Sequence, residues 1–357
     1  MEMELEFKPD FSEAQKQWKA FWNGKNRRPL VCVTLPKEGM EPVEKPLYTS
    51  GADGNFEPVI DQLLAWAASH IFIGEAIPFY YLEFGPDHFS ALLGADLKFD
   101  SNSPGTSWCQ PFIKDWDDAE IRFRRDSFWW KRTVDFAHAL RKRCDGKLLI
   151  AAPTLVANLD ALAAIRGAKE LLLDLIMCPD KVQRALNAVC QAYEEILEAL
   201  SDELGFDKFG SINRHGMYCA GKIDVLQCDF SCMISPAMFQ EFVSPCLKRQ
   251  CKALDAAEYH LDGPDAIKHL EAICQIEEID IIQWVPGAGE AQKKDWSTLY
   301  KKIDELGKGQ IRGESSEKIK QLWQEYNSRK LFFGNTTITS RKEAEDFLEE
   351  LEKHLNS

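Results

Sequence analysis

The sequence predicts an α/β protein, a single (β/α)8 barrel over residues 1–357 with residues 1–28 as an N-terminal helical extension. Short apolar runs alternate with amphipathic helical patterns from residue 205 onward, each cycle taking roughly 25 to 40 residues. The chain is long enough for a large barrel. No low-complexity linker or break in composition divides it, so one domain is favoured.

The second half of the chain carries the clearest repetition. Several of its helical patterns begin with Ser or Asp, as at Ser235 and Asp295, whose side-chain oxygens accept the free backbone N–H groups of a first helical turn. The expected strands are 209–213, 223–228, 258–261, 279–284, 309–312 and 330–333, and the expected helices are 235–254, 264–276, 296–306, 316–326 and 340–355.

The first half is less regular. We expect helices over 11–22, 159–165 and 179–204 and strands over 30–35 and 148–152. The Gly-, Pro- and aromatic-rich segment 83–118 predicts loops and short strands. Because strand spacing does not distinguish a barrel from a doubly wound open sheet, that topology stays the alternative.

Charge and cysteine usage exclude several classes of partner and location. With 57 acidic and 43 basic residues, the net charge is −14, which disfavours nucleic acid and membrane surfaces. The apolar stretch Ile71 to Leu82 is too short to span a bilayer and contains Glu75. No basic-then-apolar leader is visible. Eleven scattered cysteines, an odd number, indicate a reducing cytoplasm.

The segment Tyr259 to Gly263 is the strongest local candidate for chemistry, because an apolar run ends there in His260 and Asp262. A period of two places both side chains on one face of a strand or its exit loop. At the mouth of a barrel, they can ligate a divalent metal or act as an acid–base pair. The structural alternative is that Asp262 caps the next helix and His260 is hydrogen-bonded within the core.

A second candidate is the segment Ile281 to Gly289, where a buried strand ends in Gln283 and Trp284 before a glycine-rich turn. Gln283 would bind a polar edge of the substrate, and Trp284 would stack on a flat or cationic ligand. Trp284 is equally well explained as a core residue. Polar side chains also follow other expected strands, although solvated loops are the more frequent explanation for each; they include His215, Asp229, Glu314 and Asn335.

Several familiar catalytic motifs do not occur in the sequence. It contains no Gly-x-Gly-x-x-Gly, no Gly-x-x-x-x-Gly-Lys-Ser/Thr, no Gly-x-Ser-x-Gly, no His-Glu-x-x-His and no Cys-x-x-Cys. Dinucleotide-binding, P-loop, serine-hydrolase, zincin and cysteine-rich zinc classes therefore lack their usual sequence support.

The stretch from Leu226 to Ser231, followed by Ser235-Pro236, Phe239 to Phe242 and Pro245, resembles a segment of the uroporphyrinogen decarboxylase superfamily. In that family an Asp-Ser-containing strand end precedes a Ser-Pro-capped helix. The order of the later strand ends is similar, at 259–263, 279–284, 310–314 and 332–336. The resemblance covers roughly residues 148 to 355 and implies a (β/α)8 barrel.

The superfamily contains two kinds of enzyme. Its decarboxylases hold tetrapyrrole acetates with arginines in a Met-Arg-Gln-Ala-Gly-Arg motif, and the corresponding stretch Pro29 to Lys37 has none, which removes charge-assisted pairs to carboxylates. Its zinc-dependent methyltransferases use a His-x-Cys site and a Cys near the last strand. Here these positions read His260-x-Asp262 and Gly334-Asn335, so oxygen or amide groups replace both thiolates and make a harder metal site.

The resemblance therefore implies a divergent, methyltransferase-like enzyme that moves a methyl group between a small, cationic substrate and a corrinoid protein. A site without metal stays open, and so do a cofactor-independent decarboxylase of uroporphyrinogen or a related tetrapyrrole and a non-catalytic ligand- or corrinoid-binding protein. A homodimer is a further expectation. The expected catalytic residues are His260, Asp262 and Asp229; the residues for zinc or another divalent metal are His260, Asp262 and Glu314; the substrate-binding residues are Gln283, Trp284, His215, Glu314 and Asn335.

Overall fold

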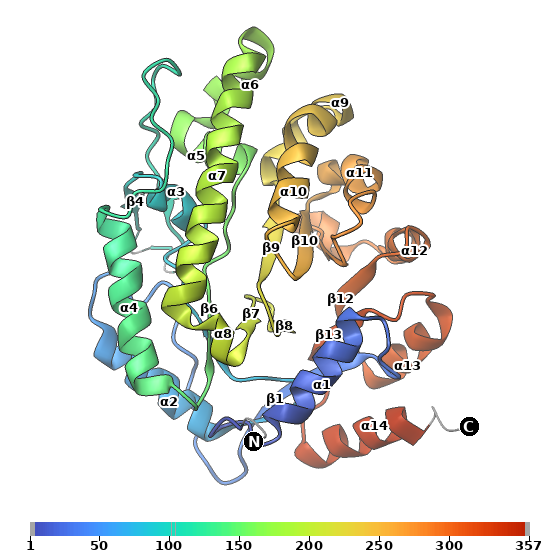
Figure 1. The fold of residues 1–357 in the computed structure, drawn as a ribbon. Coiled ribbons are helices and arrows are strands. Elements are labelled where there is room, and N and C mark those ends of the chain that lie inside the picture. Colours follow the sequence, from blue (N-terminus) through green and yellow to red (C-terminus); the bar gives the residue numbers. More distant parts are fainter. Residues whose placement is uncertain (1–3, 101, 104, 354–357) are drawn as a thin grey trace.

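A seven-stranded sheet forms the centre of the protein, with strand order β2-β1-β13-β12-β11-β10-β9 (Figure 1). The computed structural model describes residues 4–100, 102–103 and 105–353. The strands are β1 (Leu30–Pro36), β2 (His70–Gly74), β3 (Phe79–Tyr81), β4 (Leu97–Lys98), β5 (Trp108–Cys109), β6 (Leu149–Ala151), β7 (Ser211–Ile212), β8 (Tyr218–Cys219), β9 (Ile223–Gln227), β10 (Ala256–Asp262), β11 (Ile281–Val285), β12 (Gly309–Glu314) and β13 (Leu331–Thr336).

Helices separate most of these strands, and Figure 1 shows α10 to α13 along one side of β9 to β13, with α4 and α7 on the other. The α-helices are α1 (Phe11–Trp22), α2 (Phe56–Ser69), α3 (His88–Leu92), α4 (Phe128–Cys144), α5 (Leu159–Arg166), α6 (Ala168–Met177), α7 (Pro179–Leu204), α8 (Phe206–Phe209), α9 (Pro236–Met238), α10 (Ser244–Cys251), α11 (Leu270–Cys274), α12 (Ser297–Glu305), α13 (Ser316–Glu325) and α14 (Arg341–Lys353). The other helical turns are η1 (Asp229–Met233), η2 (Phe239–Val243, a π-helix), η3 (Pro264–His269) and η4 (Gly289–Lys293).

The sheet is parallel except at one edge. From β9 to β13 each strand pairs in parallel with the next, and β13 pairs in parallel with β1. Only β2 runs antiparallel, against β1. Strands β3 and β6 form a separate parallel pair, and no strand pair in the described part of the chain joins it to the main sheet. The α/β class is therefore confirmed, whereas a complete barrel stays a prediction.

Successive residues of each central strand face opposite layers, as a period of two requires. One face contributes Leu30, Ile281 and Phe332 to a buried apolar cluster that also includes residues of α1. The other face packs against the helices, where Tyr259 and Trp284 are buried. This alternation decides which strand residues can reach the site described below.

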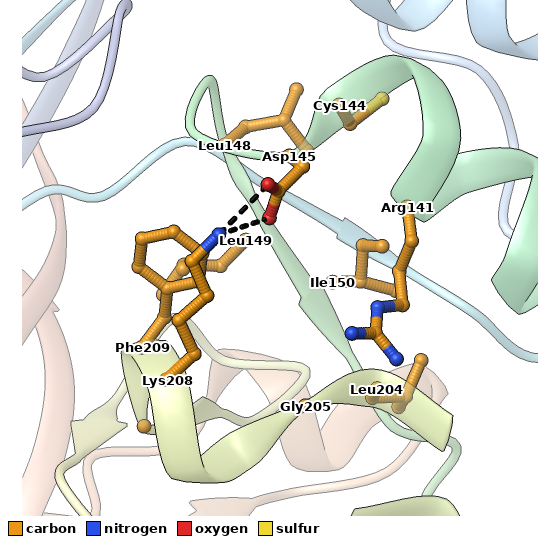
Figure 2. Close-up of a pocket in the computed structure, with 11 residues that line it drawn as sticks. Arg141, Cys144, Asp145, Leu148, Leu149, Ile150, Leu204, Gly205, Lys208 and Phe209 are labelled. Atoms are coloured by element: carbon orange, nitrogen blue, oxygen red, sulfur yellow. Dashed lines mark hydrogen bonds and ion pairs between the residues drawn. The ribbon is translucent and has the colours of Figure 1, made fainter. Parts of the chain in front are cut away.

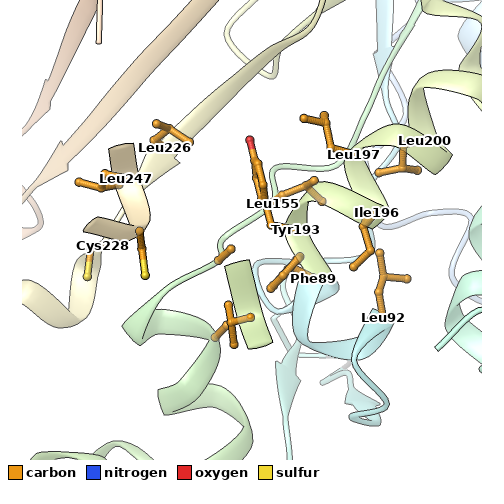
Figure 3. Packing of buried hydrophobic residues seen from close by; sticks show 14 of the residues in the cluster. Phe89, Leu92, Leu155, Tyr193, Ile196, Leu197, Leu200, Leu226, Cys228 and Leu247 are labelled. Atoms are coloured by element: carbon orange, nitrogen blue, oxygen red, sulfur yellow. The ribbon is translucent and has the colours of Figure 1, made fainter. Parts of the chain in front are cut away.

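The long helix α7 provides much of the packing between the two halves of the chain. Figure 3 shows its Tyr193, Ile196 and Leu197 beside Phe89 and Leu92 of α3. Apolar positions recur every three to four residues along α7, so a continuous stripe of its surface is buried. Glycine at the helix end, Gly205, adopts the left-handed conformation that terminates the helix.

The expected N-terminal helix is confirmed with its predicted ends at Phe11 and Trp22. Trp18 is fully buried, its ring centroid lies 5.1 Å from that of Phe332 on β13, and its indole donates to the Glu75 carbonyl at 3.2 Å. The extension therefore packs tightly on the strands. Whether residues 1–357 make a single domain stays a prediction, and residues 1–3 and 354–357 lie outside the described residues.

Other elements differ from the sequence-based prediction. The expected helix 235–254 is divided into α9, the π-helix and α10, because Pro245 lacks a backbone N–H and relaxes the hydrogen-bond ladder around it. Segment 83–118 contains the short helix α3 besides the expected short strands. Residues 206–209 form α8, so the strand expected at 209–213 is reduced to Ser211–Ile212.

Two expectations on location can be compared with the structure in part. Among the described residues, no helix is both long and apolar enough to cross a membrane. All eleven cysteines lie in the described segments, and each is a free thiol. The cytoplasmic location stays a prediction.

Candidate active site at the carboxyl ends of β9, β10 and β11

Three polar side chains form a row across neighbouring strands. His260 on β10 is in register with Gln227 on β9 and with Gln283 on β11. Parallel strands run about 4.8 Å apart, so residues in register on one face are direct neighbours. All three lie near the carboxyl ends of their strands, the end of an α/β sheet where ligands usually bind.

Two acidic residues complete a group of metal-ligating atoms with His260. One ligand atom from each of Asp229, His260 and Asp262 lies within 4.8 Å of the others. Asp262 shares its strand face with His260, and Asp229 is the first residue of η1, two residues after the last residue of β9. The Oδ1 atom of Asp262 is buried and has no hydrogen-bond partner among the described residues, so it is available to a ligand.

The position of Asp229 is set by a residue from another element. Asp160, in the first turn of α5, accepts the backbone N–H of Asp229 at 2.9 Å and that of Phe230 at 2.8 Å. These bonds satisfy the free N–H groups at the start of η1. Helix α5 thereby orients the turn that presents Asp229.

Beneath His260 lies a carboxylate that is completely buried. Glu258 is two residues earlier on β10, and its Oε2 accepts from Asn213 Nδ2 at 2.8 Å. Its Oε1 lies 2.8 Å from Nδ1 of His215. Asn213 and His215 come from the turn between β7 and β8, where Gly216 has a φ of +80° that favours glycine. The buried acid therefore anchors this turn against β10.

Hydrogen bonds connect the same turn to both sides of the row. Arg214 donates from Nη2 to Oε1 of Gln227 at 2.9 Å, and Gln227 donates to Oδ2 of Asp229 at 3.1 Å. Arg214 also donates from Nε to Nε2 of His215 at 3.3 Å.

Gln283 links His215 to His260. Its Nε2 lies 3.2 Å from Nε2 of His215, and its Oε1 is hydrogen-bonded to Nδ1 of His260. Gln283 is thus the neighbour that orients the His260 ring and leaves the other ring nitrogen, Nε2, for a ligand.

Charge and burial shift the pKa values of the two central groups on β10. Burial alone would raise the pKa of Glu258, but His215, Arg214 and His260 together lower it below its ordinary value. Burial lowers the pKa of His260, and the nearby Arg214 lowers it further. At neutral pH these shifts favour the ionised form of Glu258 and the neutral form of the His260 imidazole.

The pKa values of two further acids, Asp229 and Asp160, are raised. Asp229 as a whole residue is exposed, but its carboxyl faces the acidic group. Desolvation of that carboxyl and the like charges of Asp160 and Asp262 raise the pKa of Asp229 to about 7. Desolvation also raises the pKa of Asp160 to about 6. A divalent cation would relieve this repulsion, because opposite charge favours ionised carboxyls.

A further buried acid, Glu83, follows strand β3 and lies near Arg214. Glu83 accepts the Thr154 N–H at 3.0 Å and is hydrogen-bonded to the Tyr81 hydroxyl. Burial raises the pKa of Glu83 to about 7, although Tyr81, Arg214 and the Thr154 N–H lower it in part. Tyr81 and Glu83 repeat the spacing of two seen at His260 and Asp262, which is the sequence signal that could have identified them.

Some predicted residues make no hydrogen bond or ion pair with this group in the described part of the chain. Glu314 pairs with Arg312 on its own strand and is not among the ligand atoms gathered around His260. Asn335 is exposed at the end of β13, opposite Gly313 of β12. Trp284 lies on the helix-facing side of β11, with its ring centroid 4.8 Å from that of Trp296. Adjacent strand residues point to opposite faces, so Trp284 and Gln283 do not share a site.

The donor set fits a divalent metal. One imidazole and two carboxylates suit zinc or a harder cation, and the described part of the chain brings no thiolate into the group. The Gln283 bond to His260 Nδ1 is the contact that metal-binding histidines usually make.

The structure also contains a separate small cavity. It has a volume of about 30 Å³, enough for about two water molecules, and Figure 2 shows it between the end of α4, the start of β6 and α8. Its polar wall is the ion pair of Asp145 with Lys208 at 2.8 Å. None of the residues grouped around His260 lines it, so it is not part of the candidate site.

Comparison with known proteins identifies a similar fold. The structure resembles that of a methyltransferase from Methanosarcina mazei with a TM-score of 0.59, over 96% of this chain and 98% of that chain, at 12% sequence identity. No family model and no curated protein matches the sequence. At this identity the match shows a shared α/β fold over nearly the whole length of both chains.

Proposed function

We propose that this chain is a methyltransferase-like enzyme with a divalent metal bound by Asp229, His260 and Asp262. The observation that carries the proposal is the approach of their three ligand atoms to within 4.8 Å at the carboxyl ends of parallel strands. The similar fold of the Methanosarcina mazei methyltransferase supports the reaction class. The resemblance of residues 148–355 to the uroporphyrinogen decarboxylase superfamily supports the methyl-transfer branch, with a (β/α)8 barrel.

The reaction we propose moves a methyl group between a small substrate and a corrinoid protein. The methyl group transfers as a cation equivalent, so the bonding electron pair stays on the atom that it leaves. When bound, the metal would supply a Lewis acid next to the site of methyl transfer. His260 and the two carboxylates hold the metal, and Gln283 keeps the His260 ring in the required orientation.

Acidic surroundings indicate the kind of substrate. Glu83, Asp160 and Asp229 all have raised pKa values because burial and like charges disfavour their ionised forms. A cationic, methylated compound would stabilise them, whereas a polycarboxylate would add to the repulsion. Methyl transfer is therefore preferred to tetrapyrrole decarboxylation.

Metal content provides the direct test. We expect the purified protein to contain about one zinc or other divalent ion per chain by mass spectrometry, and H260A and D262N to lose it, because each removes a ligand. D265N, at an exposed position just outside the group, is the matched control and should keep the metal. A wild-type protein that is metal-free and indifferent to chelator would rule out the metal role.

Methyl transfer itself is tested with a corrinoid protein as acceptor. We expect conversion of its cobalt centre to the methylated form to be seen by absorbance, and to be lost in H260A. If the wild-type protein methylates no corrinoid protein and H260A leaves ligand affinity and physiological activity unchanged, a non-catalytic binding protein becomes the better explanation.

A further inference from the structure

Arg214 occupies a special place in the hydrogen-bond network of the site. It lies in the turn between β7 and β8. From there it starts two chains of hydrogen bonds, one leading to His260 and the other to Asp229. A guanidinium has five N–H donors and no acceptor, and it stays protonated in proteins. Every group that is hydrogen-bonded to Arg214 must therefore be an acceptor. This fixes which group donates and which accepts in each later hydrogen bond of the two chains.

The direction of the hydrogen bonds toward His260 follows from this rule. Because Arg214 Nε donates to Nε2 of His215 at 3.3 Å, that nitrogen carries the lone pair, and the His215 proton is on Nδ1. The Nδ1 atom lies 2.8 Å from Oε1 of Glu258, but neither atom has a hydrogen-bond partner among the described residues. This contact therefore does not fix the His215 proton, and the hydrogen bond from Arg214 decides its position.

The next link is the amide of Gln283. Its contact with Nε2 of His215, at 3.2 Å, requires a donor, so the Gln283 NH2 group faces His215 and its oxygen faces His260. Nδ1 of His260 must then donate to this oxygen. The remaining ring nitrogen of His260, Nε2, has its lone pair free, which is the form that binds a metal.

The direction of the hydrogen bonds toward Asp229 follows from the same rule. Nη2 of Arg214 donates to the Gln227 oxygen at 2.9 Å, so the Gln227 NH2 group points the other way, toward Oδ2 of Asp229 at 3.1 Å. Asp229 therefore accepts a hydrogen bond that orients its carboxyl.

We propose that Arg214 is a positioning residue that sets the direction of both chains and thereby holds His260 with its Nε2 lone pair free and Asp229 oriented for a common ligand. The inference rests on the proposed function for the identity of the ligand, but the tautomer of His260 is a property of the metal-free protein. Loss of Arg214 removes the only group in these chains that cannot accept a hydrogen bond. The amide of Gln283 can then turn over, and His260 can place its proton on Nε2.

The test is the tautomer of His260 in protein with 15N-labelled histidine. Two-dimensional 1H–15N spectra of the metal-free protein distinguish an N–H ring nitrogen from an unprotonated one, and H260N assigns the signals. We expect wild-type His260 to carry its proton on Nδ1. In R214M a substantial Nε2–H population should appear, and affinity for added Zn²⁺ should fall about 10- to 100-fold.

Two variants make the result specific. R214K keeps a cation that can only donate, so it should retain more of the Nδ1–H form than R214M does. R249M removes an arginine that pairs with Glu194 on the outer helices and should leave the tautomer and zinc affinity unchanged. If R214M does not fold, Q283M, which cuts the chain beyond His215, is measured in its place and should show the same change at His260.

The inference is overturned if wild-type His260 carries its proton on Nε2, or if R214M and Q283M keep the wild-type tautomer. Equal effects of R214K and R214M would reduce Arg214 to a structural role and would also overturn it. If the tautomer changes as expected while the wild-type protein binds no zinc, the positioning role stands and the proposed metal-dependent function fails.

Discussion

At the scale of single residues, the alternation of side chains along a strand explains which predicted residues meet. His260 and Asp262 share a face, and the candidate ligand group that they form also includes Asp229 from the neighbouring strand end. Gln283 is in register with His260 and hydrogen-bonded to it, a contact that the sequence did not predict, and its role in substrate binding stays a prediction. Trp284 was predicted beside Gln283, yet one step along a strand turns it to the helix side.

Glu258 is expected to be important for stability as well as for the site. It is fully buried and is paired with Asn213 and His215. Removing one partner of a buried charged pair leaves the others unsatisfied and costs about 3 to 5 kcal/mol. We therefore expect E258A to lower the free energy of unfolding in urea by that amount. E194A, which breaks a partly exposed ion pair, should change it by at most about 1 kcal/mol; equal losses would contradict the prediction.

His88 is expected to make stability depend on pH. It is fully buried, accepts the Phe84 N–H through Nδ1 at 3.1 Å and contacts the Thr133 hydroxyl at 2.9 Å. Burial lowers its pKa to about 3, whereas in the unfolded chain a histidine titrates near about 6.5. Between these values only the unfolded state binds the proton, so stability falls as the pH falls.

The size of this effect follows from linkage. The His88 contribution is complete above about pH 6.5 and decreases by about 1.4 kcal/mol per pH unit below it. We expect the difference in unfolding free energy between wild type and H88Q to shrink at this rate between pH 6 and pH 4. A difference that is constant with pH would show that His88 is not held neutral.

At the scale of elements, the contact between α5 and η1 connects secondary structure to the site. Asp160 accepts two N–H groups of η1, including that of Asp229. This contact joins segments nearly seventy residues apart in the chain, so the pattern of either segment alone does not predict it.

We expect D160A to release the start of η1 and to move Asp229 away from the ligand group. The affinity for added Zn²⁺, measured by calorimetry, should fall about 10-fold or more, as for other residues that support metal ligands. D160N keeps one acceptor oxygen and should lose less. An unchanged affinity in D160A would mean that Asp229 is held in place by other contacts or is not a ligand.

Element prediction succeeded where a regular pattern was long and failed where packing decided. The helices starting at Phe11 and Pro179 were predicted with their observed ends, because each has a strong apolar stripe. Helices α2 and α4 were not predicted; many of their residues are buried beneath other elements, so their patterns are less amphipathic. The antiparallel strand β2 depends on a neighbour far along the chain, and local propensity does not specify it.

At the scale of the whole molecule, the N-terminal helix tests whether residues 1–28 and the strands form one cooperative unit. Trp18 is fully buried against Phe332, and removing a buried aromatic side chain costs about 3 to 5 kcal/mol. We expect W18A to lower the midpoint of a single unfolding transition seen by both fluorescence and circular dichroism. K19A, at an exposed position of the same helix, is the control. Two separate transitions would show that the helix and the strands unfold independently.

The sequence by itself determined the α/β class, the repetition of strands and helices after residue 205, and the pair His260 and Asp262 with its chemical character, because periodicity and residue type are local properties. Only the tertiary structure decided that Asp229 comes within 4.8 Å of His260 and Asp262, that Glu314 and Trp284 lie apart from them, and that Arg214 directs the hydrogen bonds of the site. Those relations depend on strand register and on the position of the β7–β8 turn, which bring together residues from segments that are distant in the chain.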